Sequence, residues 1–93
     1  MTQVAVYFEG ERGERSDFGD ASFWPTREAA VDDLVEIGAL CIYDYAGEEI
    51  GTISEGDLAE LRATGEWSYE VFDEYGVACG RRSVVVYDHT DIS

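Results

Sequence analysis

Three carboxylates are spaced to lie in one row along a predicted helix. In the stretch TREAAVDDLVEIGA, residues 26–39, Glu28, Asp32 and Glu36 follow one another at intervals of four. On a helix this spacing places them on one face, roughly 6 Å apart. No basic residue lies between them, and like charges at this spacing cost about 0.2–0.5 kcal/mol per pair. The chemistry that such a row offers is simultaneous pairing with several Arg or Lys side chains of a partner.

The whole chain is strongly acidic. It has 21 acidic residues and 6 basic residues, all of them Arg, and its net charge is −15 over 93 residues. A net charge of about 2–8 in magnitude is enough to keep a small domain soluble. Residues 26–64 hold 10 of the acids and 2 Arg, a net charge of −8. Such a polyanion attracts basic partners and is repelled by nucleic acid and anionic membranes, so neither of these is expected to bind directly.

The composition predicts a folded domain rather than an acidic tail. Hydrophobic residues make up 45% of the chain and aromatic residues 13%. The length predicts a single domain, residues 1–93, whose self-repulsion could make folding depend on salt or on a homodimer partner. The N-terminal sequence lacks the features of a signal peptide, and no apolar run approaches the ~20 residues of a membrane span. We therefore expect a cytoplasmic protein.

Other reactive residue types occur without a recognisable pattern. Cys41 and Cys79 lie among apolar or small neighbours and are expected to be buried free thiols, with a disulfide or a reactive thiol as the alternatives. Asp88, His89 and Asp91 could begin a metal site, but no second ligand cluster completes it. We assign no metal and no cofactor. No nucleophile and base can be paired from spacing alone, so an enzyme is not expected.

The element that must position the acidic row is a helix after Pro25. Thr26 is the expected N-cap, and Gly38 ends the helix. An apolar stripe opposite the acids faces the core and leaves Asp33 in solvent with the row. The residues of the stripe are Val31, Leu34, Val35 and, half a turn off, Ile37.

The remaining elements alternate strands with a second helix. A capping box of Ser54 and Asp57 begins that helix, which continues through Arg62 and ends at Gly65. Strands are predicted at residues 2–8, 40–45, 49–53, 66–72 and 83–88. The order β-α-β-β-α-β-β predicts an α+β domain, with one mostly antiparallel sheet of about five strands and two helices packed on one face.

Residues 9–25 are rich in Gly and charge and are predicted to be a long loop. Three aromatic residues, Phe18, Phe23 and Trp24, lie within it. We expect them to anchor the loop to the core; the alternative is an aromatic contact with a partner.

The stretch Ala39–Leu61 resembles a segment of ArdA-type antirestriction proteins, in which an aromatic-Asp-Tyr-x-Gly turn precedes an acidic helix. It covers about a quarter of the chain. The matching positions are Tyr43, Asp44, Tyr45 and Gly47, followed by Asp57 and Glu60. In size and charge the chain also resembles the small acidic anti-defence proteins of phages and mobile elements, including many anti-CRISPR proteins. These resemblances imply an inhibitor that occupies a DNA-binding surface of a host nuclease or surveillance complex in the host cytoplasm.

Charge and resemblance together predict an interaction protein that imitates nucleic acid and binds a basic nucleic-acid-binding host protein or complex. The expected contact residues are Glu28, Asp32, Asp33 and Glu36 on the first helix, Glu48 and Glu49 on the hairpin, and Asp57 and Glu60 on the second helix. The alternative is an ordinary small domain of a salt-loving organism, whose acidity reports the solvent rather than a partner.

Overall fold

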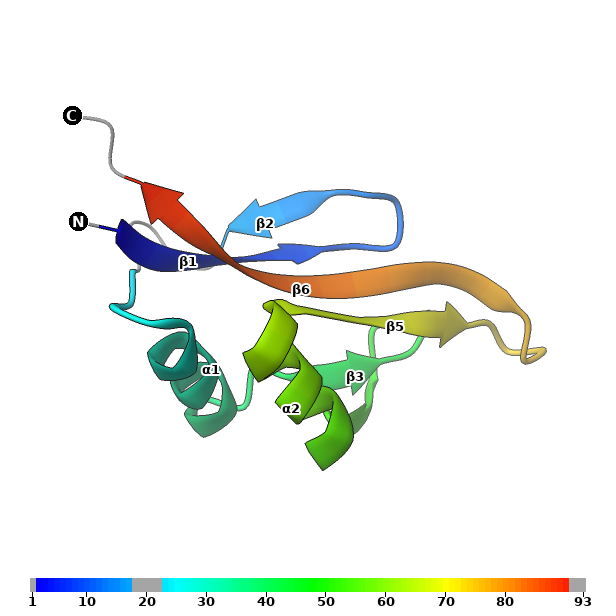
Figure 1. Ribbon diagram of the computed structural model, residues 1–93. Helices are drawn as coiled ribbons and strands as arrows, with labels where there is room; N and C mark the ends of the chain where they lie inside the picture. Colours follow the sequence, from blue (N-terminus) through cyan, green and yellow to red (C-terminus); the bar gives the residue numbers. More distant parts are fainter. Residues whose placement is uncertain (1, 18–22, 91–93) are drawn as a thin grey trace.

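A computed structural model describes residues 2–17 and 23–90 (Figure 1). The elements, in chain order, are β1 (Thr2–Glu9), β2 (Arg15–Asp17), α1 (Arg27–Glu36), β3 (Cys41–Tyr43), β4 (Glu49–Thr52), α2 (Glu55–Thr64), β5 (Glu66–Phe72) and β6 (Ala78–Thr90). β1, β2, β5 and β6 form an antiparallel sheet in the order β2-β1-β6-β5, and β3 pairs with β4 in a second, two-stranded sheet. The predicted α+β class is therefore confirmed.

Strand β6 organises the four-stranded sheet because it pairs with β1 along one side and with β5 along the other. Its register places Val84 opposite both Phe8 and Trp67. Side chains alternate between the two faces of a strand, so these three residues lie on one face of the sheet. The predicted alternation in residues 66–72 is confirmed, since Trp67 and Val71 are buried while Glu66 and Glu70 are exposed.

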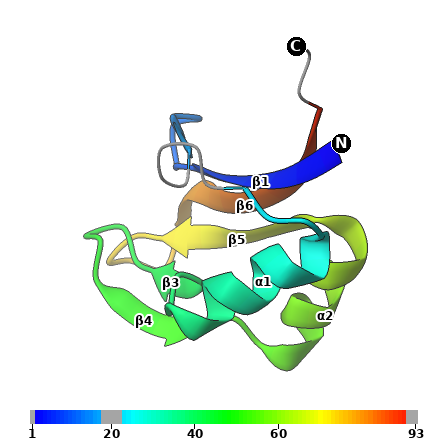
Figure 2. The ribbon, with the colours of Figure 1, turned by 90° about the vertical axis from the view of Figure 1, so that its left-hand side faces the viewer.

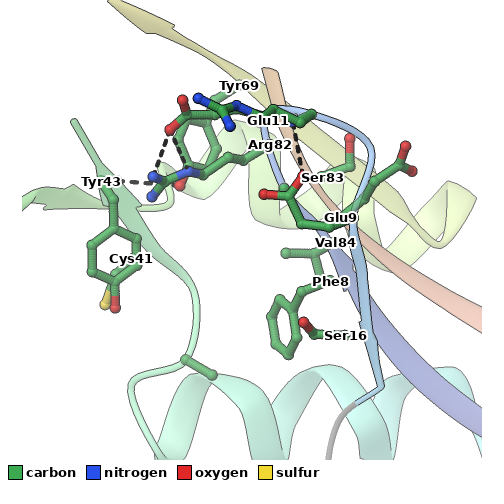
Figure 3. A pocket seen from close by; sticks show the side chains of 14 residues that line it. Phe8, Glu9, Glu11, Ser16, Cys41, Tyr43, Tyr69, Arg82, Ser83 and Val84 are labelled. Carbon is green, nitrogen blue, oxygen red and sulfur yellow. Dashed lines mark hydrogen bonds and ion pairs between the residues drawn. The ribbon is translucent and has the colours of Figure 1, made fainter. Parts of the chain in front are cut away.

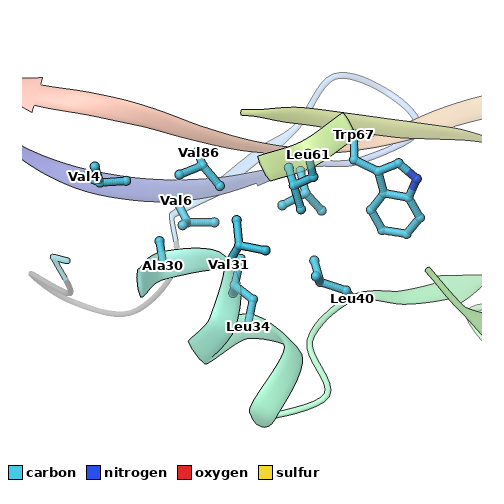
Figure 4. Close-up of a cluster of buried hydrophobic side chains, with 10 residues drawn as sticks. Val4, Val6, Ala30, Val31, Leu34, Leu40, Leu61, Trp67 and Val86 are labelled. Carbon is cyan, nitrogen blue, oxygen red and sulfur yellow. The ribbon is translucent and has the colours of Figure 1, made fainter. Parts of the chain in front are cut away.

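Both helices cover the same face of this sheet (Figures 1 and 2). The buried side chains between the layers come from β1, β5, β6, the two helices and the segment after α1 (Figure 4). They are Val4, Val6, Ala30, Val31, Leu34, Leu40, Leu61, Trp67, Val84 and Val86. Every member is apolar, so the charge of the chain lies outside this layer.

The helix ends match the sequence signals. The Thr26 hydroxyl accepts a hydrogen bond from Ala29 N at 3.1 Å, and Ser54 Oγ accepts one from Asp57 N at 3.2 Å. At the other end of α2, Gly65 takes a left-handed conformation with φ of 82° and donates its N–H to Leu61 O. These bonds satisfy backbone groups that a helix leaves without partners at its ends.

The predicted apolar stripe of α1 is wrong at two positions. Val31 and Leu34 are fully buried as expected, and Ala30 is buried beside them. Val35 and Ile37, however, are exposed. One helix residue turns the side chain by about 100°, so Val35 lies beyond the edge of a stripe that contains positions 30, 31 and 34. Ile37 is the C-cap that follows the last residue of α1, so the helical stripe does not extend to it.

The predicted loop at residues 9–25 contains a strand. β2 pairs with the end of β1, with Phe8 opposite Ser16 and Glu9 opposite Arg15. A three-residue polar strand has too little alternation to be recognised from sequence. Farther along, Trp24 and Val4 exchange two backbone hydrogen bonds of 2.8 and 2.9 Å.

The three aromatic residues of this segment differ in position. Trp24 packs against the core as predicted, whereas Phe23 is exposed on the surface of the protein. Phe18 lies outside the described residues.

The hairpin at residues 40–53 forms its own sheet instead of joining the large one. β3 lies beside β5, and the two strands are joined by a hydrogen bond that Tyr43 N donates to the Tyr69 hydroxyl at 3.2 Å. A bulge between Ile42 and Tyr43 shifts the register of the hairpin. The predicted single sheet of about five strands is thus divided into four strands and two.

Three hairpin turns share one backbone geometry. They span Gly10–Glu14, Asp44–Glu48 and Asp73–Val77. In each, the first residue donates its N–H to the carbonyl of the fifth, and a glycine at the fourth position, with φ of 78° to 81°, donates to the carbonyl of the first at 3.0 Å. This is the geometry of a turn followed by a left-handed glycine that suits the twist of paired strands.

Gly65 gives the first testable prediction. An added Cβ would lie 2.6 Å from Val86 O, and the left-handed backbone already disfavours other residues. We expect Gly65→Ala to lower the free energy of unfolding by about 1–3 kcal/mol, measured by urea denaturation. Gly56→Ala, in α2 with open space around it, is the matched control and should leave stability unchanged or raise it by less than about 1 kcal/mol. Equal effects of the two variants would contradict the assigned role of Gly65.

Candidate protein-binding surface

The structure places the eight predicted contact residues in three groups rather than in one patch. The first group, on α1, is Glu28, Asp32, Asp33 and Glu36; the second, on α2, is Asp57 and Glu60; the third, on the β3–β4 hairpin, is Glu48 and Glu49. All of these residues are exposed except Asp33.

Asp33 has a structural contact that its sequence position did not reveal. Its Oδ2 accepts a hydrogen bond from Trp24 Nε1 at 3.1 Å, and the residue is partly buried. The prediction that Asp33 lies in solvent is therefore wrong. The indole N–H needs an acceptor when the ring packs against the core, and Asp33 supplies it. This bond attaches the segment before α1 to the helix itself.

The row on α1 is not wholly uncompensated. Arg62 of α2 forms an ion pair with Asp32, with Nη2 2.6 Å from Oδ1. Among the described residues, the two carboxylates on either side, Glu28 and Glu36, have no cation within ion-pair distance. The pair joins the middle of the row to the second helix, a tertiary contact that spacing along α1 could not show.

A second interhelical contact lies at the start of α1. The Arg27 guanidinium donates to the carbonyl of Ala63 at 2.7 Å and to that of Arg62 at 3.3 Å. These carbonyls belong to the last turn of α2, where the helix dipole favours a positive charge. Arg27 and Arg62 together fix the two helices against each other, and neither neutralises Glu28 or Glu36.

Asp57 and Glu60 lie on the side of α2 that faces the outer edge of β5. There they line a groove of about 440 Å³ together with Glu66 and Glu9. None of the groove's lining residues is basic. We call these four residues the groove carboxylates. Glu9 and Glu66 were not predicted to join the site, because they reach the groove only through the pairing of β1 and β5 with β6 and the packing of α2 beside β5.

The hairpin acids occupy a third position. The Asp44 side chain accepts hydrogen bonds from Ala46 N and Glu48 N, both at 2.9 Å, and so fixes the turn. Glu48 and Glu49 are exposed. Glu49 also acts on the buried Cys41: hydrogen bonding to Glu49, followed by burial, raises the pKa of the Cys41 thiol above its usual value of 9.0. The thiol therefore remains protonated near neutral pH.

A pocket of about 730 Å³ lies between the β1–β2 turn, β3 and the middle of β6 (Figure 3). Its apolar side includes Phe8, Tyr43 and Val84, and Arg82 crosses it between Glu11 and Tyr43. Arg82 Nη2 and Nε donate to Glu11 Oε1 at 2.6 and 3.1 Å. This pair was not predicted, because its members are 71 residues apart in the sequence.

Arg82 connects all three sides of this pocket. In addition to its bonds with Glu11, Arg82 donates a hydrogen bond to the Asp44 carbonyl at 3.4 Å. Its guanidinium carbon lies 5.6 Å from the centre of the Tyr43 ring. Burial alone lowers the pKa of Arg82, but its bonds to Glu11 and Tyr69 outweigh burial and raise that pKa. The guanidinium is therefore a permanent positive cross-link between two hairpin turns.

The prediction that both cysteines are buried is wrong for Cys79. Cys79 is exposed, whereas Cys41 is buried as expected, and both are free thiols. Cys79 lies near the start of β6, on the part of the strand that extends past the helices, so its small apolar neighbours are exposed as well.

In residues 2–17 and 23–90 no group of three His, Cys, Asp or Glu residues is arranged to hold a metal ion. The side chains of His89 and Asp91, which belong to the considered metal site, lie outside the described part of the chain. Across the same described ranges, the helices are too short or too polar to cross a membrane.

No protein-family model, curated protein sequence or solved structure matches this chain.

The Arg82–Glu11 pair gives the second prediction. Both side chains are about three-quarters buried, with exposures of 25% and 24%, whereas the Arg81–Glu70 pair is open, with exposures of 60% and 50%. Glu11→Gln should lower the free energy of unfolding by about 1–2 kcal/mol, because it leaves the guanidinium poorly paired. Glu70→Gln should cost less than about 0.5 kcal/mol. If chemical denaturation finds equal costs, the buried pair does not hold the turns together.

The Cys41 thiol gives the third prediction. Because the fold raises its pKa, the folded state keeps the proton at a pH where the unfolded chain has released it. Its contribution to stability is complete below the usual pKa of 9.0 and is lost as the pH rises through the raised pKa. Between about pH 8 and pH 10.5, the free energy of unfolding measured with urea should therefore fall more steeply with pH for the wild type than for Cys41→Ala. Parallel losses would contradict the raised thiol pKa.

Proposed function

We propose that this protein is an acidic inhibitor that binds a basic nucleic-acid-binding host protein and blocks the surface on which that protein holds nucleic acid. The observation that carries the proposal is the rigid display of exposed carboxylates on two cross-linked helices. Glu28 and Glu36 flank the Asp32–Arg62 pair on α1, and the groove carboxylates line the far side of α2.

Carboxylate spacing supports the comparison with a nucleic-acid backbone. Glu28 and Glu36 are eight residues apart on α1, which separates them by roughly 12 Å, of the order of three to four phosphate steps at about 3.4 Å of rise each. A basic groove that engages phosphates with several Lys or Arg side chains could therefore engage Glu28 and Glu36 in the same way.

Rigidity supports the proposal because an ordered surface loses little conformational entropy on binding. α1 is held at its start by Arg27, in its middle by Asp32, and on its inner side by Asp33, which accepts the Trp24 N–H. The net charge of −15 would also draw a basic partner toward this surface, and salt would weaken that attraction.

A specific observation favours a second candidate function, salt adaptation in a halophilic organism. The exposed acids lie on α1, beside β5 and on the β3–β4 hairpin, rather than on one face. Acidity spread over the surface is what a high-salt solvent selects. If this candidate is correct, the domain folds only at molar salt, which circular dichroism would detect, and it captures no basic protein at any salt concentration.

The fourth prediction tests the α1 row. The binding partner for this test is the host protein that the immobilised domain captures from a lysate at low salt and that duplex DNA displaces. Glu28→Gln with Glu36→Gln should weaken binding of this captured host protein about tenfold, because two charge contacts are lost while the Asp32–Arg62 pair remains. The matched control neutralises two exposed acids of the sheet, Glu70→Gln with Asp88→Asn, and changes the net charge equally. Binding is measured with purified protein at low salt, with duplex DNA as competitor.

Equal weakening by both double variants would show that net charge, rather than the row on α1, determines binding. Unchanged binding by the α1 variant would remove α1 from the interface.

A further inference from the structure

The tip of the β5–β6 hairpin is an exposed apolar cluster on a highly charged protein. Phe72, Tyr75 and Val77 are 48%, 82% and 60% exposed. They lie within six residues, on the part of the hairpin that projects beyond both helices (Figure 1). Single exposed apolar residues are common on proteins, but a cluster with a tyrosine at its tip is typical of an interaction site.

The tip is rigid as well as exposed. Asp73 Oδ1 accepts hydrogen bonds from Tyr75 N at 2.9 Å and from Val77 N at 3.0 Å. Asp73 N donates to Val77 O at 2.9 Å, and Gly76 N donates to Asp73 O at 3.0 Å. Four bonds within five residues hold the Tyr75 backbone in one conformation, so the ring is presented from a fixed base.

The turn itself does not require a tyrosine at this position. The turn Asp44–Glu48 makes the same four bonds, and there the residue equivalent to Tyr75 is Ala46, whose N–H donates to Asp44 Oδ1 at 2.9 Å. Alanine is therefore sufficient for this geometry. Tyr75 adds a ring that contributes nothing to the turn and is almost wholly in solvent.

We propose that the β5–β6 tip is the apolar anchor of the interface, and that Tyr75 enters an apolar, base-binding pocket bordered by basic side chains on the nucleic-acid-binding partner. This inference rests on the proposed function. Proteins that hold single-stranded nucleic acid stack its bases on aromatic side chains beside a basic track for the phosphates. An aromatic ring with the exposed carboxylate of Glu74 next to it presents the same two features, a flat ring and a negative charge.

Charge complementarity favours a basic partner, rather than a second copy of the chain, as the protein that covers the β5–β6 tip. Tips from two copies would bring Glu74 and its equivalent together, on chains that each carry −15. Like charges that face each other across an interface oppose association. A basic partner instead neutralises the carboxylate at the rim while its apolar pocket covers Tyr75, the arrangement of an aromatic centre within a polar rim.

The fifth prediction uses Tyr75→Ala, with Tyr45→Ala as the matched control. Both replace an exposed tyrosine in turns of one geometry, and Ala46 shows that the Tyr75 turn accepts alanine. With the purified host protein that wild type captures and that DNA displaces, Tyr75→Ala should weaken binding at least tenfold, and Tyr45→Ala less than about twofold. A single-stranded oligothymidine should displace wild type at a lower concentration than duplex DNA does.

Each other outcome overturns the inference in a distinguishable way. If Tyr75→Ala binds the DNA-displaceable partner as tightly as wild type, the tip is not the anchor and the proposed function still stands. Displacement by duplex DNA alone would exclude a base-binding pocket. If no captured protein is displaced by DNA, both the proposed function and the anchor fail. If sedimentation shows a dimer that Tyr75→Ala dissociates, the tip pairs two copies instead.

Discussion

The apolar seam between the four-stranded sheet and the two helices has to hold the chain together against a net charge of −15. It includes valines from β1 and β6 facing Val31, Leu34 and Leu61, and none of its side chains is charged. Repulsion among surface carboxylates is weakened by water and salt, while burial of a valine or leucine contributes about 1.5–3 kcal/mol regardless of charge. The fold tolerates its acidity because the two effects act in separate layers.

The chain has six arginines, and three of them join separate elements. Arg27 and Arg62 connect α1 to α2, and Arg82 connects the β1–β2 turn to the β3–β4 turn. These side chains cross-link the backbone without neutralising Glu28, Glu36 or the groove carboxylates. The acidic surface is consequently both rigid and largely uncompensated, which are the properties that binding to a basic groove requires.

Local signals in the sequence determined most of the fold, and long-range packing determined most of the site. The caps at Thr26 and Ser54 and the alternation in residues 66–72 depend on neighbours within a few positions, so they could be predicted. The strand β2, the separate β3–β4 sheet and the contact between Asp33 and Trp24 depend on which elements meet in space. For the same reason, the row of acids on α1 could be predicted from spacing within one helix. The grouping of Glu9 and Glu66 with Asp57 and Glu60 could not, because it depends on the packing of separate elements.

In the proposed function, carboxylates on this surface take the place of phosphates. The most direct measurement is the dissociation constant of the complex with the captured host protein over a range of salt concentrations, with and without duplex DNA. If the carboxylates do so, affinity falls steeply as salt rises, and DNA raises the apparent dissociation constant linearly with its free concentration, as a competing ligand does. Salt-independent affinity, or a ternary complex in which DNA and this protein bind the partner together, would contradict it.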